Sequence, residues 1–115
     1  MSRQPQALNY TSGTISNSAE TIFEIAEITA GATVTSAPTG ARSFVGTVES
    51  AAIRARGDGT DPTGSEGMLI GNGDQVYLGE SEFSSMEFYA DTSTDAKLRG
   101  HFYNVEVDVI LGKVS

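Results

Sequence analysis

Apolar and polar residues alternate with a period of two along much of this chain, and this alternation restricts its fold more than any other feature. It is clearest in residues 42–56, 75–78, 86–91 and 96–111. Because successive side chains of a strand point to opposite faces, each segment is expected to be a strand with one buried face. Turn-forming Gly, Asp, Asn and Ser residues separate the segments. About seven or eight short strands at this spacing predict an all-β fold, a single-domain β-sandwich or jelly-roll-like barrel.

Three segments give more detail. In residues 42–56 the inward set shifts from Phe44, Gly46 and Val48 to Ala51, Ile53 and Ala55, and one such change of parity predicts a β-bulge or a sheet corner. Residues 68–70 predict a short buried strand, followed by a tight turn at 71–74. Residues 96–111 predict the longest strand, because the alternation is cleanest there.

The first 41 residues are harder to assign. Residues 1–19 are polar and small, which predicts a flexible or partner-docking N-terminal arm beside a sandwich domain at 20–115. Within residues 20–30, Asn17 followed by Glu20 resembles a helix start, whereas the isoleucines and threonines favour a strand, which we prefer. Residues 33–35 predict a short strand and residues 37–40 a turn.

Composition excludes several classes of partner. The chain has 115 residues, enough for one domain, and a formal net charge of −8 from 15 acidic and 7 basic residues. An acidic chain is repelled by a phosphate backbone, so no nucleic acid partner is expected.

The chain contains no cysteine, so it forms no disulfide or thiolate–zinc site. No apolar run approaches the roughly 18 residues of a membrane span, so no membrane partner is expected, and no secretory signal is visible.

The Gly- and Asp-rich segment 57–67 is the main candidate site. Arg56, Gly57 and Asp58 spell the tripeptide of integrin ligands, but we favour a structural role, with φ > 0 at Gly57 and Gly59 and with Asp58 bonded to nearby amides. Four carboxylates offer oxygen ligands for Ca²⁺, although their spacing does not match an EF-hand: Asp58, Asp61, Glu66 and Asp74. We therefore predict neither a metal ion nor a cofactor.

Other chemical groups give weaker patterns. His101 is the single histidine and is expected on the outward face of the last strand, where it cannot form a zinc site alone. Glu80 with Glu82, or Glu106 with Asp108, resemble a glycosidase carboxylate pair, but Glu106 and Asp108 also fit a solvated strand face. We predict no catalytic residue. Three tyrosines offer a platform for sugar stacking, which leaves a carbohydrate-binding β-sandwich module as an alternative: Tyr77, Tyr89 and Tyr103.

One run of residues resembles a known family. It has Ala51-Ala52-Ile53-Arg54, then Asp58-Gly59-Thr60-Asp61-Pro62-Thr63, then Gly67-Met68-Leu69-Ile70 and Gly73-Asp74. Small β-rich virion structural proteins of tailed bacteriophages carry a similar run, and Phe83–Tyr89 and Asp95–Leu98 resemble their last section. The likeness covers about residues 45–105 and leaves the first 40 residues unmatched.

The resemblance implies a non-enzymatic virion structural protein, assembled into the virion in the host cytoplasm. The preferred role is capsid decoration, in which a cement protein binds the outer shell and stabilises it; a neck, tail or fibre component is the alternative. The expected partners are the major capsid protein or other virion proteins, and further copies of the chain, with a trimer favoured. The expected interface loop comprises Arg54, Arg56, Asp58, Asp61, Pro62 and Glu66.

Overall fold

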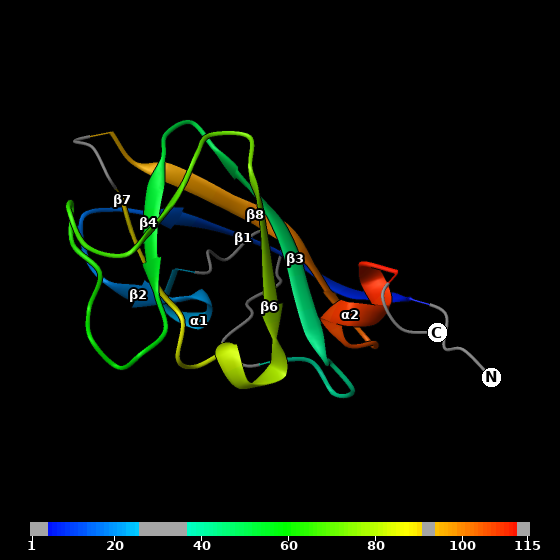
Figure 1. Cartoon of the computed structure of the whole chain (residues 1–115). Coiled ribbons are helices and arrows are strands. Elements are labelled where there is room, and N and C mark those ends of the chain that lie inside the picture. The colour runs from blue at the N-terminus through cyan, green and yellow to red at the C-terminus, as the bar shows by residue number, and fades with distance from the viewer. Residues whose placement is uncertain (1–4, 26–36, 91–93, 113–115) are drawn as a thin grey trace.

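The structure is a computed structural model that describes residues 5–25, 37–90 and 94–112, in which two antiparallel sheets of four strands pack face to face (Figure 1). The first sheet has the order β1 (Ala7–Ile15), β8 (Ala96–Tyr103), β3 (Ser43–Glu49), β6 (Gln75–Gly79). The second has the order β2 (Glu20–Thr21), β7 (Glu87–Ala90), β4 (Ile53–Arg56), β5 (Met68–Ile70). The predicted all-β sandwich is confirmed.

The core lies between the two sheets and draws on both of them. The largest fully buried side chains include Phe44 and Phe102 from the first sheet and Phe88 and Ile53 from the second. The ring of Phe102 is central, because it makes edge contacts with Phe44 and Phe83 at centroid distances of 5.2 Å in both cases. Burying aromatic rings of this size supplies much of the free energy that holds one sheet on the other.

The chain turns a corner between β3 and β4, as the parity change predicts. It leaves the first sheet at Glu49 and enters the second at Ile53. Ser50, between the two strands, has φ = 79°, a left-handed conformation that reverses the direction of a chain in little space. The corner places β4, and the loop that follows it, on the second sheet.

The predicted long strand over residues 96–111 is wrong beyond Tyr103. Tyr103 pairs with Ala7 on one side and Ser43 on the other, and both neighbouring strands end there. Without a neighbour the backbone satisfies its hydrogen bonds locally, in the single helical turn α2 (Val107–Ile110). Val105 stays buried, and its carbonyl accepts a bond of 2.7 Å from the Ser43 hydroxyl.

The predicted arm over residues 1–19 is wrong for residues 7–15, because they form β1. This strand pairs along the length of β8, with a register shift between Ala7 and Tyr10. Its last residue, Ile15, is 0% exposed. Residues 7–15 are therefore part of the sandwich, whereas residues 1–4 lie outside the described residues.

Within residues 20–25, which are the described part of the preferred strand over residues 20–30, only β2 is a strand. A one-turn helix, α1 (Ile22–Ile25), follows at once. Its start is stabilised by a hydrogen bond of 2.8 Å from the Thr21 amide to the Glu24 carboxylate, which is half of a capping box. The expected Asn17 and Glu20 pair is not the one that starts the helix. Residues 26–36, with the predicted strand at 33–35, lie outside the described residues.

The predicted turns are confirmed, but one strand is misplaced. The Ala41 amide donates a hydrogen bond of 3.0 Å to the Pro38 carbonyl, and the Asp74 amide donates one of 3.0 Å to the Gly71 carbonyl. The strand predicted as buried, β5, instead lies at the edge of its sheet, with Met68 57% and Leu69 58% exposed. A 3₁₀ turn, η1 (Glu80–Glu82), links β6 to the segment before β7. Among the described residues no helix is long and apolar enough to cross a membrane.

Candidate functional site

The loop of residues 57–67 connects β4 to β5 and lies at one end of the sandwich. In Figure 1 it is the green loop at the left, whereas α2 and the start of β1 lie at the right. Most of its residues are exposed, but Pro62 is fully buried. Loops carried on a rigid sheet are common places for binding residues.

Side-chain bonds fix the first half of this loop. The Arg56 Nε lies 2.8 Å from Asp58 Oδ1, and the same oxygen accepts the Thr60 amide at 3.1 Å. The hydrogen bond from Arg56 and the bond from the Thr60 amide lower the pKa of Asp58, and the bond to Asp58 raises the pKa of Arg56. The predicted structural role of Asp58 is confirmed, since its carboxylate accepts the Thr60 amide.

The two glycines of the tripeptide region differ. Gly59 has φ = 88°, as predicted, and glycine adopts this conformation without steric cost. The prediction of φ > 0 at Gly57 is wrong. A Cβ at Gly57 would lie 3.2 Å from the Met86 side chain, so close packing restricts this position.

Hydrogen bonds of the backbone and of the Thr63 and Arg54 side chains cross the second half of the loop. The Thr63 amide donates 2.9 Å to the Glu66 carbonyl, and the Glu66 amide donates 3.1 Å to the Thr63 hydroxyl. The Ser65 amide also points to that hydroxyl, at 3.3 Å. On β4, the Arg54 guanidinium donates 3.3 Å to the Gly67 carbonyl. Both halves of the loop are thus crossed by hydrogen bonds.

Asp61 connects the loop to β7. Burial raises the pKa of Glu87 on β7, and a hydrogen bond with Asp61 raises it further. The structure thus places four of the six predicted interface residues in the loop, with Asp58, Asp61 and Glu66 exposed and Pro62 buried. The other two, Arg54 and Arg56, belong to β4.

Two of the four carboxylates considered for Ca²⁺ are engaged in structural bonds of their own. Asp58 is paired with Arg56, and Asp74 lies in the next turn, where its Oδ2 accepts the Gly71 amide at 2.9 Å. Within residues 5–25, 37–90 and 94–112, no group of three or more metal-ligating side chains is found.

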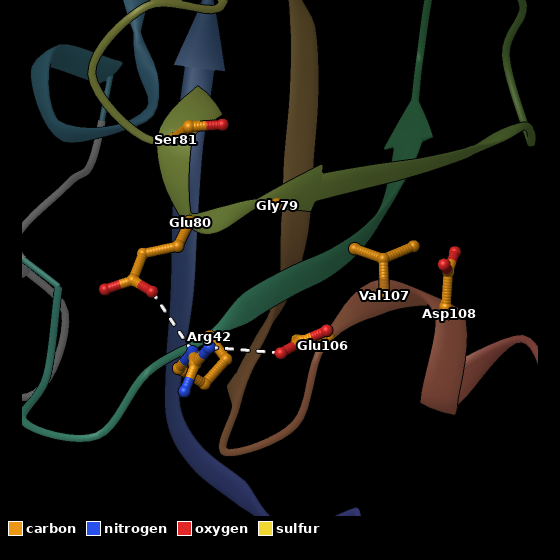
Figure 2. Close-up of a pocket in the computed structure, with 7 residues that line it drawn as sticks. All are labelled: Arg42, Gly79, Glu80, Ser81, Glu106, Val107 and Asp108. Atoms are coloured by element: carbon orange, nitrogen blue, oxygen red, sulfur yellow. Dashed lines mark hydrogen bonds and ion pairs between the residues drawn. The ribbon is translucent and has the colours of Figure 1, made fainter. Parts of the chain in front are cut away.

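A second polar site, absent from the sequence predictions, centres on Arg42. Glu80 and Glu106 point toward its guanidinium from two sides, each 3.1 Å away, in a pocket of about 590 Å³ (Figure 2). Glu106 is 64 residues from Arg42 in the chain, so no local pattern connects them. Asp108 also lines the pocket, but it lies in α2, so the expected strand face of Glu106 and Asp108 is wrong.

The three tyrosines of the carbohydrate-binding alternative are divided between the two sheets. Tyr77 and Tyr103 lie in the first sheet, on β6 and β8, whereas Tyr89 lies in the second sheet, on β7. His101 on β8 is partly exposed and contacts the rings of Tyr10 and Tyr103, at centroid distances of 5.3 and 6.3 Å. The three tyrosines therefore do not form a single platform on one sheet.

Comparison with known proteins adds no relative. No protein-family model matches the chain, and no curated protein or solved structure matches it significantly.

Proposed function

We propose that this chain is a non-enzymatic structural protein of a bacteriophage virion, which decorates the outer capsid shell by binding it through the loop of residues 57–67. The resemblance of residues 48–63 to phage virion proteins supports the class of protein. The single observation that carries the binding role is the loop itself, which is exposed yet held by its own hydrogen bonds.

A preorganised loop favours binding because less conformational entropy is lost when a partner engages it. Immobilising a side chain at an interface costs roughly 0.5–1.5 kcal/mol, and a loop already fixed avoids much of that cost. The Thr63 hydroxyl accepts two amides and the Asp58 carboxylate accepts one amide and one guanidinium. These bonds are made without the partner, so the exposed atoms of the loop are presented in a fixed shape.

The charge of the loop supports a basic surface as the partner. Asp61 and Glu66 are exposed, and the chain has a net charge of −8. Opposite charges on the two surfaces speed association, and salt screens this attraction. Binding to the shell is therefore expected to weaken as ionic strength rises.

The ion pairs at the Arg42 pocket support a structural role in place of catalysis. Arg42 holds Glu80 and Glu106 together, and these residues come from three separate parts of the fold: the segment before β3, η1 and the segment before α2. In this proposal the pocket ties β3 to the end of the sandwich opposite the loop.

The test mixes the purified protein with undecorated capsid shells of the phage that encodes it and measures the protein that sediments with them. We expect saturable binding. Thr63→Val removes the hydroxyl that accepts two loop amides and leaves the charge unchanged, so affinity should fall about tenfold. Thr39→Val, in an exposed turn, is the matched control and should bind like wild type.

Two outcomes would count against the proposal: no saturable binding, or equal binding by both threonine variants. The number of copies bound per particle separates decoration from the alternative. Hundreds of copies indicate the shell, whereas a number near six or twelve indicates a neck or tail position, as expected for their symmetry.

A further inference from the structure

The outer edge of β5 is exposed and apolar. The strand pairs with β4 on one side and lies at the edge of its sheet on the other. Four large apolar side chains are exposed among the described residues, and two of them, Met68 and Leu69, are adjacent on this three-residue strand. Natural edge strands are usually protected by charges, prolines or bulges, because their free backbone groups readily pair with another strand.

The sequence around β5 is nearly a palindrome. It reads Gly67-Met68-Leu69-Ile70-Gly71, with apolar residues on either side of Leu69 and glycine at both ends. An antiparallel pairing of two such strands about Leu69 places Leu69 opposite Leu69, and Met68 opposite Ile70. The same register places Glu66 opposite Asn72, so no two carboxylates of these segments face each other.

We propose that the occupant of this edge is a second copy of the chain, and that two β5 strands pair antiparallel about a twofold axis at Leu69. The pairing joins the second sheets of the two copies into one continuous sheet. A twofold interface uses the same patch on both copies, and a self-complementary strand meets this requirement. The near-palindrome therefore favours a dimer over the trimer expected from the sequence.

An open hollow lies beside the strand. It has a volume of about 680 Å³ and lies where β5 approaches the edge of the first sheet, with Leu69, Ile70 and Tyr77 among its lining residues. In the proposed dimer, the second β5 strand would lie next to this hollow. Burial of Leu69 and Met68 from both copies would remove apolar surface that is exposed in one copy alone.

Charge opposes the association at long range and limits its strength. Each copy has a net charge of −8, so two copies repel each other. The range of this repulsion falls to about 8 Å at physiological ionic strength. The dimer is therefore expected to strengthen as salt is added, whereas binding to a basic shell weakens, and the two kinds of association are distinguishable.

Sedimentation velocity over a wide concentration range tests the proposal with the full-length protein alone. Wild type should show a monomer–dimer equilibrium that shifts toward the dimer with added NaCl. Leu69→Ser should raise the dissociation constant about tenfold or more. Leu111→Ser is the matched control, since Leu111 is 42% exposed but lies beyond α2, and it should dimerise like wild type.

Cross-linking tests the register. The chain has no cysteine, so Leu69→Cys introduces one thiol at the proposed axis, where directly opposed residues have Cβ atoms about 4.5–5.5 Å apart. On mild oxidation this variant should form a disulfide dimer much faster than Leu111→Cys. The proposal is overturned by a monomeric wild type at all concentrations, by a trimer as the sole oligomer, by equal effects of the two serine variants, or by equal cross-linking of the two cysteine variants.

Discussion

Two glycines make room for the aromatic centre of the first sheet. Gly46 on β3 and Gly100 on β8 are directly opposed, and the ring of Phe44 lies close to both. A Cβ at Gly100 would lie 2.1 Å from the Val45 carbonyl oxygen and 2.8 Å from the Phe44 ring. Real Cβ atoms do not approach backbone so closely, so any side chain here must displace a strand or the ring.

We therefore predict that Gly100→Ala lowers the free energy of unfolding by about 3 kcal/mol, the upper end of typical overpacking costs. Gly64→Ala is the control, because a Cβ there meets no atom within 4 Å, and its effect should stay within about 0.5 kcal/mol. Urea denaturation followed by circular dichroism measures both. Equal stabilities of the two variants would show that the glycine pair is not required.

Glu87 gives a pH dependence whose sign follows from its raised pKa. Burial and the contact with Asp61 favour the protonated form in the folded state. The stability linked to this group is complete below the unfolded pKa, near 4.3, and is lost as pH rises through the higher folded pKa. Glu87→Gln mimics the protonated form, so it should raise the melting temperature at neutral pH and have little effect below about pH 4.

Asp58→Asn provides the opposite case. The pKa of Asp58 is lowered by Arg56, so its contribution is present above the unfolded pKa and is lost as pH falls through the folded value. Asp58→Asn should therefore lower the melting temperature at neutral pH and leave it unchanged in acid. The effect should be small, because the Arg56–Asp58 pair is exposed to solvent. Melting curves across the pH range check both signs, and a Glu87→Gln variant that is less stable at neutral pH contradicts the first.

At the scale of secondary-structure elements, substitutions in β1 test whether residues 7–15 are part of the sandwich or a detached arm. Ile15 is fully buried at the end of β1, whereas Asn9 on the same strand is exposed. Ile15→Ala should cost about 2–5 kcal/mol of unfolding free energy because it leaves a cavity in the core. Asn9→Ala should change it by less than about 0.5 kcal/mol. Chemical denaturation measures the difference, and an unchanged stability of Ile15→Ala would mean that β1 is detached.

Elements were predictable where a local pattern decides them. The corner between β3 and β4 is visible because the inward face changes parity within a few residues, and the turn at 71–74 because Gly and Asn suit it. The end of β8 was not predictable, since Val105, Val107 and Val109 continue the alternation and the strand stops where its neighbours stop. The helix α1 had a local signal in Thr21 and Glu24, but the isoleucines favoured a strand.

The candidate site also has some features that the local sequence predicts and others that it does not. The Gly- and Asp-rich composition located the loop of residues 57–67, because such residues cannot continue a strand. The ion pairs of Arg42 have no local sequence signal, because Glu80 and Glu106 are both far from Arg42 in the chain. The exposure of β5 was missed for a related reason, since three apolar residues look the same whether a strand lies in the middle of a sheet or at its edge.

For the whole molecule, the shared core predicts cooperative unfolding. Leu98 belongs to the first sheet and Phe88 to the second, and both are buried in the same apolar cluster. Because neither sheet can bury its inner face alone, the two should unfold together in one transition. Leu98→Ala and Phe88→Ala should each shift that single transition by about 2–5 kcal/mol.

Far-ultraviolet circular dichroism and tyrosine fluorescence, recorded on the same urea series, test this prediction. The tyrosines report on both sheets, since Tyr77 lies on β6 and Tyr89 on β7, and the chain has no tryptophan to obscure them. Coincident curves for wild type and both variants are expected. A variant whose two curves separate, with one sheet lost before the other, would mean that each sheet is stable on its own and that the apolar layer between them is not what holds the fold.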